Sequence, residues 1–343
     1  MLHTAAFNGT DWRADNAPEK PARLPEYVSP AFKQLIETAQ PADAAALRRQ
    51  VIASAAEQRI AESERADPLG EARYCVTPYL VHQYRNRVLL LATGRCLSYC
   101  RYCFRREFTA RASGFISAEE TEQVCAYLSA HPAVQEILVS GGDPMSGSFT
   151  ELEHLLRRLR TVSPQLLIRL CTRALIFAPE LFTDELLQLL RAVRPLWIIV
   201  HINHPAELGE AQRYALTRCI ESGIPVQSQT VLLHGVNDKA ALLAELFHAL
   251  VCIGVKPGYL FQMDLACGTA GFRVPLGKAA EIWKEVRGLL SGLSMPQFAV
   301  DLPGGGGKFP LAALFLYDDI IRSLQDDCFA ARGIDGAEYI YPR

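Results

Sequence analysis

The chain has 343 residues, of which 50% are hydrophobic and 21% are charged, and its formal net charge is −2. This supply of apolar residues is sufficient for a sizeable core and excludes a disordered chain. The near-neutral charge disfavours nucleic acid or an anionic membrane as the main partner. No apolar run approaches the roughly 18 residues that span a bilayer, and the first twenty residues hold no signal-like stretch, so we predict a cytoplasmic protein.

The chain begins with a segment rich in alanine, glutamate and arginine. Helical periodicity runs over residues 41–63, and Pro68 and Gly70 interrupt the pattern soon afterwards. We therefore predict a helical N-terminal segment at residues 1–85, a main domain at 86–310 and a C-terminal tail at 311–343.

From residue 87 onward, short strand-like runs alternate with longer amphipathic runs. Strands are predicted at residues 87–93, 136–140, 166–171, 196–202, 226–232, 259–264 and 297–301. Helices are predicted at residues 117–130, 149–159, 183–193, 209–221, 239–252 and 278–290. This alternation indicates an α/β fold with a parallel sheet, doubly wound or barrel-like. Right-handed crossovers place the helices outside and the strand C-termini at one mouth, where such folds bind ligands.

Three of the ten cysteines follow the first strand directly, at Cys96, Cys100 and Cys103. Three thiolates in one loop can face a single inorganic centre, and an iron–sulfur cube held by three rather than four leaves one iron open for a small molecule. A structural zinc ion needs a fourth ligand, yet Cys75 and Cys267 are isolated. The neighbouring arginines are unsuited to a packed core. The spacing therefore predicts a [4Fe–4S] site.

Four other cysteines occur singly in apolar surroundings, and we predict that each is an ordinary core residue: Cys125, Cys171, Cys219 and Cys252.

The second strand ends in the run Ser140-Gly141-Gly142-Asp143-Pro144. Bare glycines let the backbone approach a ligand closely, and Asp143 is suited to fix an ammonium group. Such a segment alone is more often a turn. Its position at the edge of the predicted sheet favours ligand binding.

Four consecutive glycines precede Lys308, and this stretch is unusual because ordering glycine is entropically costly. A phosphate-binding Walker loop needs glycine where Leu302 stands and serine or threonine where Phe309 stands, so that motif fails at both ends. A lysine on a pliant loop near a barrel mouth is suited to form a Schiff base.

The cysteine spacing, with Tyr102 before the last cysteine, resembles the signature of the radical S-adenosylmethionine (SAM) superfamily. The segment 301–308 resembles the pyridoxal 5′-phosphate (PLP) lysine motif of the lysine 2,3-aminomutases within that superfamily, and the resemblance extends from about Asp67 to Pro310. It implies a partial (β/α)6 barrel, a [4Fe–4S] cluster, SAM and PLP. It also implies an isomerase that moves an amino group between C2 and C3 of lysine to make β-lysine.

The resemblance implies roles residue by residue. Cys96, Cys100 and Cys103 are expected to hold the cluster, and Lys308 is expected to bind PLP and act in catalysis. The substrate residues are expected to be Arg105 at the carboxylate, and Asp264 and Asp301 at the distal ammonium of lysine.

The remaining cofactor contacts are also carried over by resemblance. Arg87 is expected near the PLP phosphate, and Gln229 at the SAM or active-site wall. His201 and His204 either line the SAM pocket or pack at the end of a strand. The amino group of SAM is expected to bind beside the second strand, at Ser140, Gly141, Gly142 and Asp143.

Long members of the family carry a zinc-binding C-terminal extension that joins subunits, so a zinc-bridged oligomer is not expected here and a homodimer is left open. The short form resembles relatives that make (R)-β-lysine for elongation factor P, although those diverge within the glycine-rich stretch. Other open alternatives are a 2,3-aminomutase for another amino acid and a non-catalytic iron–sulfur sensor. We expect a small-molecule substrate and a one-electron reductant such as flavodoxin or ferredoxin, with no nucleic acid or membrane partner.

Overall fold

The computed structural model describes residues 22–111, 114–312, 321–325, 328–332 and 337–341. A ten-stranded sheet forms its centre, and the strands lie in the sheet in their chain order from β1 to β10. The parallel part consists of β3 (Arg87–Thr93), β4 (Glu136–Gly141), β5 (Leu167–Thr172), β6 (Leu196–His201), β7 (Val226–Leu232), β8 (Lys256–Gln262) and β9 (Gln297–Leu302).

Antiparallel strands extend both edges of this parallel sheet. At one edge β1 (Cys75–Thr77) and β2 (Leu80–Tyr84) precede β3, and at the other β10 (Gly307–Pro310) folds back on β9. Because β1 and β10 are the ends of the strand order rather than neighbours, the sheet does not close into a complete barrel. The predicted partial barrel is therefore confirmed.

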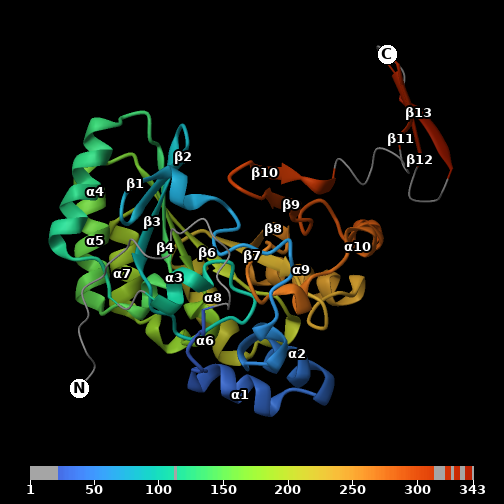
Figure 1. Cartoon of the computed structure of the whole chain (residues 1–343), viewed down its shortest axis with the longest axis horizontal. Coiled ribbons are helices and arrows are strands. Elements are labelled where there is room, and N and C mark those ends of the chain that lie inside the picture. Colours follow the sequence, from blue (N-terminus) through green and yellow to red (C-terminus); the bar gives the residue numbers. More distant parts are fainter. Residues whose placement is uncertain (1–21, 112–113, 313–320, 326–327, 333–336, 342–343) are drawn as a thin grey trace.

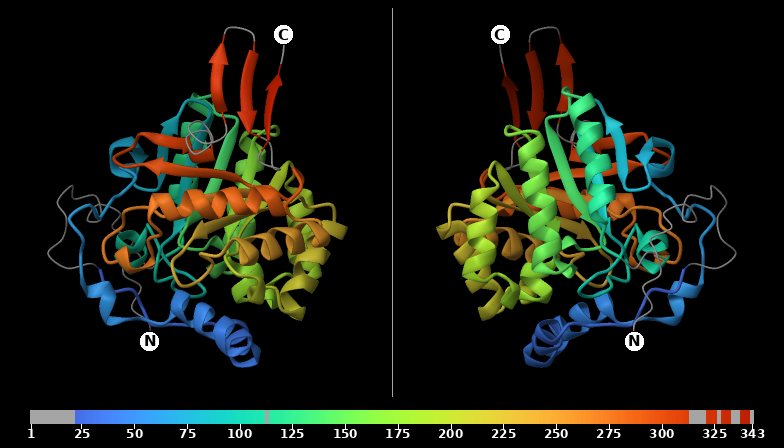
Figure 2. Two further views of the ribbon diagram at one scale, coloured as in Figure 1. Left: turned by 90° about the vertical axis from the view of Figure 1, so that its right-hand side faces the viewer. Right: turned by 90° about the vertical axis from the view of Figure 1, so that its left-hand side faces the viewer.

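Helices cover the outer face of the sheet (Figures 1 and 2). The long ones are α4 (Ala118–Ala130), α5 (Phe149–Val162), α7 (Asp184–Ala192), α8 (Glu210–Glu221), α9 (Ala240–Ile253) and α10 (Leu276–Leu289). Serine and glutamate fix two of the starts: Ser117 with Glu120 and Ser148 with Glu151 form capping boxes that satisfy free backbone N–H groups. All six predicted helices are present, with ends displaced by three residues at most.

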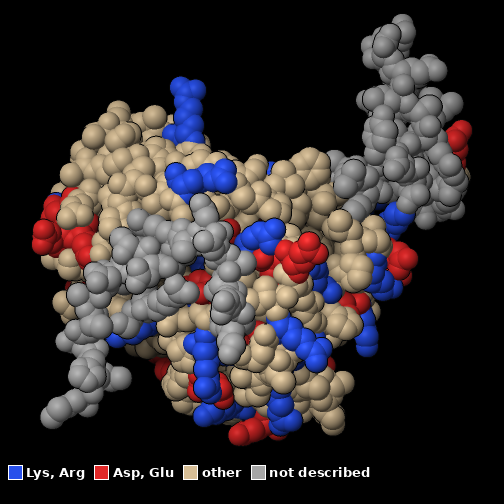
Figure 3. Space-filling model, in the orientation of Figure 1, with Lys and Arg blue, Asp and Glu red and all other residues tan. Residues whose placement is uncertain are grey.

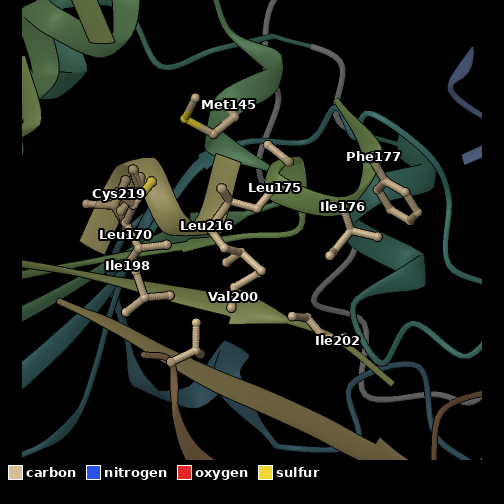
Figure 4. Packing of buried hydrophobic residues seen from close by; sticks show 14 of the residues in the cluster. Met145, Leu170, Leu175, Ile176, Phe177, Ile198, Val200, Ile202, Leu216 and Cys219 are labelled. Carbon is tan, nitrogen blue, oxygen red and sulfur yellow. The ribbon is translucent and has the colours of Figure 1, made fainter. Parts of the chain in front are cut away.

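The core lies between the sheet and this outer layer of helices, which bury one face of the parallel strands. In β6, Ile198 and Val200 are fully buried, and they pack with Leu216 and Cys219 of α8 (Figure 4). Each such aliphatic side chain contributes about 1.5–3 kcal/mol relative to exposure. The apolar layer fixes the strands whose C-terminal ends carry polar residues.

The N-terminal helices lie against one end of the barrel (Figure 1): α1 (Pro30–Thr38) and α2 (Pro41–Val51). The predicted helix over residues 41–63 is too long. The backbone is extended at Ile52, and a 3-10 turn at Ala55–Gln58 follows. This break directs the carboxylate of Glu57 onto two arginines of the cysteine loop, so a tertiary ion pair takes precedence over helical periodicity.

Three other details differ from the sequence predictions. Strand β8 begins at Lys256 rather than at residue 259, because Pro257 and Gly258 lie within the strand beside β7. Strand β10 was not predicted, because it starts inside the glycine run. The third difference is that β1 and β2 bring residues 75–84 into the sheet.

A separate three-stranded antiparallel sheet follows the barrel, comprising β11 (Ile321–Gln325), β12 (Cys328–Arg332) and β13 (Glu338–Tyr341). The domain limits at residues 85 and 310 stay predictions, and residues 1–21 lie outside the described part. Among the described residues, none of the helices is long and apolar enough to cross a bilayer. Lysine, arginine, aspartate and glutamate are interspersed on the face shown in Figure 3.

Candidate active site

The barrel encloses a cavity of about 390 Å³. Residues from both edges of the sheet line this cavity, so side chains that are far apart in the sequence lie close together. It brings together all the site residues of the sequence prediction except His204: Arg87, Cys96, Cys100, Cys103, Arg105, Ser140, Gly141, Gly142, Asp143, His201, Gln229, Asp264, Asp301 and Lys308.

The cysteine loop, residues 94–106, follows the C-terminal end of β3. Burial and the neighbouring thiols raise the pKa of Cys96 well above its usual value and that of Cys103 to about 11. These thiols are therefore protonated when free and must release protons to bind iron. Within the described chain, the side chains do not converge into a site for a single metal ion. A cube, whose thiolates bind separate irons, does not require that convergence.

Two buried ion pairs hold the back of the cysteine loop. Glu57 accepts hydrogen bonds from Arg101 at 2.6–3.0 Å and from Arg106 at 3.0 Å. All three side chains are at most 3% exposed. The arginines beside the cysteines therefore serve, through Glu57, to fix the loop from outside the cavity.

A third buried arginine, Arg173 at the end of β5, touches the loop directly. Its Nη1 lies 3.0 Å from the Sγ of Cys100 and donates to the hydroxyl of Tyr102 at 2.6 Å. Its Nη2 donates to Gln50 and to Glu207, whose side chain is fully buried. Helix α2, through Gln50, thus belongs to the scaffold of the cysteine loop.

The run Ser140–Pro144, which begins in the last two residues of β4, lies against the cysteine loop. A Cβ added to Gly141 would lie 2.4 Å from the carbonyl oxygen of Thr93, and one added to Gly142 would lie 2.1 Å from that of Arg95. Gly141 also has a φ of +109°. Both glycines are therefore required for the close approach of two backbone segments, whatever their role toward a ligand.

Asp143 connects neighbouring strand ends. Its carboxylate accepts hydrogen bonds from the Thr172 hydroxyl at 2.7 Å, the Arg173 backbone N–H at 2.8 Å and the Met145 backbone N–H at 3.0 Å. The side chain thus has three partners already. Its contact with a ligand ammonium stays a prediction.

Lys308 lies on strand β10 rather than on a loop. The glycines form a tight hairpin between β9 and β10, with positive φ at Gly304, Gly305 and Gly307. The hairpin register sets Lys308 opposite Asp301. The Lys308 Nζ donates to both carboxylate oxygens of Asp301, at 2.8 and 3.0 Å, and lies 4.7 Å from the centre of the Phe261 ring.

Asp264 lies just beyond β8 in the same part of the cavity. Burial and the nearby Asp301 raise its pKa to about 7, although Lys308 and Arg105 act in the opposite direction. The charged form of Asp264 is disfavoured because its carboxylate is buried beside a second carboxylate. This arrangement is suited to receive a cationic group.

The other predicted contacts are distributed around the wall. Arg87 stacks on the Tyr84 ring at 3.7 Å. Burial and Arg173 lower the pKa of His201 to about 3, so this imidazole is neutral. His204 is buried, and its Nδ1 accepts a hydrogen bond from the Ala206 backbone N–H. The side chain therefore has a structural role, as the N-cap of the following 3-10 turn. Gln229 pairs in the sheet with His201.

Comparison with known proteins gives a consistent set of matches. Residues 90–247 match the model of the radical SAM superfamily. A protein of Treponema pallidum (strain Nichols), named as a candidate L-lysine 2,3-aminomutase, is 60% identical over 93% of this chain and 90% of its own length. The chain belongs to the lysine 2,3-aminomutase family.

Two further matches have lower sequence identity. The L-lysine 2,3-aminomutase of Acetoanaerobium sticklandii is 37% identical over 83% of this chain and 68% of its own length. A radical SAM methyltransferase structure from Sphaerobacter thermophilus is 18% identical, with a TM-score of 0.48 over 64% of this chain and 68% of that one.

Membership of the lysine 2,3-aminomutase family within the radical SAM superfamily implies a [4Fe–4S] cluster and SAM. The residues present fit these groups. Three cavity-lining cysteines supply thiolates, which are the usual ligands of such clusters. Gly141 and Gly142 bring bare backbone to the wall beside them.

Some residues that line or support the cavity were not predicted from the sequence. Glu71, Arg173 and Phe261 line the cavity, and Gln50, Glu57 and Glu207 support it from behind. They come from segments with no local motif. Only a charged residue in an otherwise apolar stretch, such as Arg173, gave a signal.

Two of the four cysteines predicted to be core residues are placed elsewhere. Cys125 and Cys219 are buried, as predicted. Cys171 lines the cavity, because alternation along β5 turns it inward with Arg169. Cys252 is exposed near the end of α9, where it faces away from the sheet.

Proposed function

We propose that the protein is an L-lysine 2,3-aminomutase that interconverts L-α-lysine and β-lysine by moving an amino group between C2 and C3. The observation that carries the proposal is the meeting of two motifs in one cavity. The cysteine loop comes from the first parallel strand and Lys308 from the last hairpin, yet both line the same space.

The cofactors bring the reactive groups. When bound, the cluster and SAM supply an adenosyl radical that removes a hydrogen atom, and PLP supplies an electrophilic carbonyl and a conjugated ring that delocalises an unpaired electron. The protein's task is to hold these groups and the amino acid in one geometry and to exclude water.

Each end of the substrate has a matching charge on the wall. Arg105 offers a guanidinium to the α-carboxylate, and the aspartates Asp264 and Asp301 offer carboxylates to a distal ammonium. An Asp301 carboxylate no longer paired with the Lys308 amine would be available to the distal ammonium of the substrate. The aspartate pair favours lysine over an acidic amino acid, which would require a positive group there.

PLP is assigned to the lysine side of the cavity. Lys308 provides the primary amine, and Arg87, which stacks on Tyr84, provides a positive charge for a phosphate. These side chains fit the cofactor chemically, since PLP requires an amine and a cationic phosphate site.

Anaerobic reconstitution tests the proposal. The protein is loaded with iron, sulfide and PLP and incubated with L-lysine, SAM and dithionite, which replaces the flavodoxin or ferredoxin that we propose as reductant. Amino acids are resolved by mass spectrometry. We expect β-lysine from the wild type and none from Cys100→Ala or Lys308→Ala. Cys252→Ala and Lys278→Ala, at exposed positions outside the cavity, serve as matched controls.

The outcomes separate the alternatives. SAM cleavage without β-lysine retains the radical chemistry and rejects lysine, and a panel with arginine then identifies the amino acid. An intact cluster without SAM cleavage rejects the enzymatic proposal. Addition of elongation factor P together with its ligase tests whether the product serves protein modification.

A further inference from the structure

Arg105, which is expected to bind the substrate carboxylate, already has a carboxylate partner within the chain. Its Nε donates to Glu71 Oε2 at 2.9 Å and its Nη2 donates to Glu71 Oε1 at 2.5 Å. The two side chains are 14% and 8% exposed, and both line the cavity. This is a paired, two-point contact of the kind that fixes the plane of a guanidinium.

Glu71 occupies only the side edge of the Arg105 guanidinium. Glu71 does not engage the end of the group, which is formed by Nη1 and the second N–H of Nη2. Nη1 points toward Ser140, whose Oγ is 3.5 Å away, and the ring of Phe104 lies 4.4 Å from the guanidinium carbon. Arg105 and Ser140 both line the cavity, so a ligand carboxylate that reaches Nη1 of Arg105 meets the Ser140 hydroxyl beside it.

Glu71 is itself held firmly. Its backbone N–H and that of Ala72 donate to the two carboxylate oxygens of Asp67, at 3.0 and 2.9 Å. The same segment touches the glycine hairpin, because the Gly304 N–H donates to the carbonyl of Pro68 at 3.0 Å. A carboxylate anchored this way fixes the orientation of the Arg105 guanidinium.

We propose that Glu71 is a positioning residue that aims Arg105 at the substrate α-carboxylate, and that Ser140 contributes its hydroxyl to the same carboxylate. This inference rests on the proposed function, since it concerns how the amino acid is held. It gives the Ser140 side chain a role toward the substrate in place of the predicted role toward SAM.

The alternative is that Glu71 competes with the substrate for Arg105. The two predictions have opposite signs. If Glu71 positions Arg105, it stays paired with Arg105 when the amino acid binds, and its loss weakens binding. If Glu71 competes with the substrate, it must leave Arg105, and its loss strengthens binding.

Steady-state kinetics of Glu71→Gln distinguish them. We expect the KM for L-lysine to rise about tenfold or more, with kcat changed less than about threefold, because the carboxylate is gripped equally before and during the reaction. Glu71→Asp, which retains the charge, is expected to recover part of the loss. Ser140→Ala is expected to raise KM by a smaller factor. An unchanged or lower KM in Glu71→Gln overturns the inference.

A substrate analogue tests the contact itself. L-lysinamide lacks the carboxylate charge, so wild-type enzyme should prefer lysine to lysinamide, and Glu71→Gln and Arg105→Gln should both reduce that preference. A purely structural defect would weaken both ligands alike and would overturn the inference. The matched control is Glu122→Gln, which breaks a two-point pair with Arg158 on the outer helices. It should alter neither KM nor the preference.

Calorimetric binding of amino acids to PLP-loaded protein separates this inference from the proposed function. Binding without turnover rejects the aminomutase reaction and leaves the effect of Glu71→Gln on affinity as the test. If a different amino acid is the substrate, the same comparison applies, because every amino acid carries the α-carboxylate. Failure of the wild type to bind any amino acid overturns both.

Discussion

The two ends of the cavity are built differently. At the cysteine end, Arg101, Arg106 and Arg173 are at most 5% exposed, and each is paired with a glutamate of the chain. At the lysine end, Lys308 is 34% exposed and pairs with Asp301, a residue that the proposed reaction assigns to the substrate. A buried scaffold holds the first end, whereas Lys308 and Asp301 at the second end pair with each other, and the proposed function replaces that pairing with contacts to ligands.

This difference predicts that breaking an ion pair lowers the free energy of unfolding by unequal amounts at the two ends. The largest loss of stability is expected at the cysteine end. Glu207→Ala removes the buried carboxylate partner of Arg173 and leaves a guanidinium uncompensated. We expect the free energy of unfolding to fall by about 3–5 kcal/mol, measured by urea titration of the cluster-free protein. Glu122→Ala, at an exposed pair, is the control, with a loss below about 1 kcal/mol. A loss equally small in Glu207→Ala would contradict the contrast.

The approach of Gly142 to the cysteine loop gives the next prediction. An alanine Cβ at this position would lie 2.1 Å from the Arg95 carbonyl oxygen, so the loop must shift. We expect Gly142→Ala to lose most of its iron after reconstitution and about 1–3 kcal/mol of stability. Iron content and the visible absorbance of the cluster provide the measurement. Gly277→Ala, with open space around it, should match the wild type. Full iron loading of Gly142→Ala would show that the loop tolerates the shift.

The contrast between the two ends of the cavity also explains which features could be predicted from the sequence alone. The cysteine spacing could be recognised directly, because its three ligands lie in one loop, and the strand–helix alternation predicted the sheet. Glu57, Glu71 and Glu207 could not be predicted, because each meets its arginine only after distant segments have packed together. The glycine run concealed β10 for a related reason: its positive φ values form a hairpin whose register becomes evident only beside β9.

Asp264 gives a smaller effect with a defined pH dependence. Its pKa is about 7 in the fold against an ordinary value of 3.8, so the folded chain holds this proton more tightly than the unfolded chain does. Between those pH values, raising the pH therefore removes stability. Asp264→Asn has no proton to lose, and we expect it to gain about 1–2 kcal/mol above pH 7 and nothing near pH 4. Thermal unfolding of the ligand-free protein across this range measures the difference, and a gain independent of pH would refute it.

The Lys308–Asp301 pair gives the smallest expected change in stability. A third of the lysine side chain is exposed, so water screens the attraction, and breaking such a pair costs less than about 1 kcal/mol. We expect Asp301→Asn to unfold within that margin of the wild type and yet to lose affinity for lysine. Unfolding titrations and amino-acid binding, measured on one preparation, test both expectations. If Asp301→Asn instead lost as much stability as Glu207→Ala, the lysine end would be a scaffold as permanent as the cysteine end, and the exchange of Lys308 for substrate at Asp301 would be wrong.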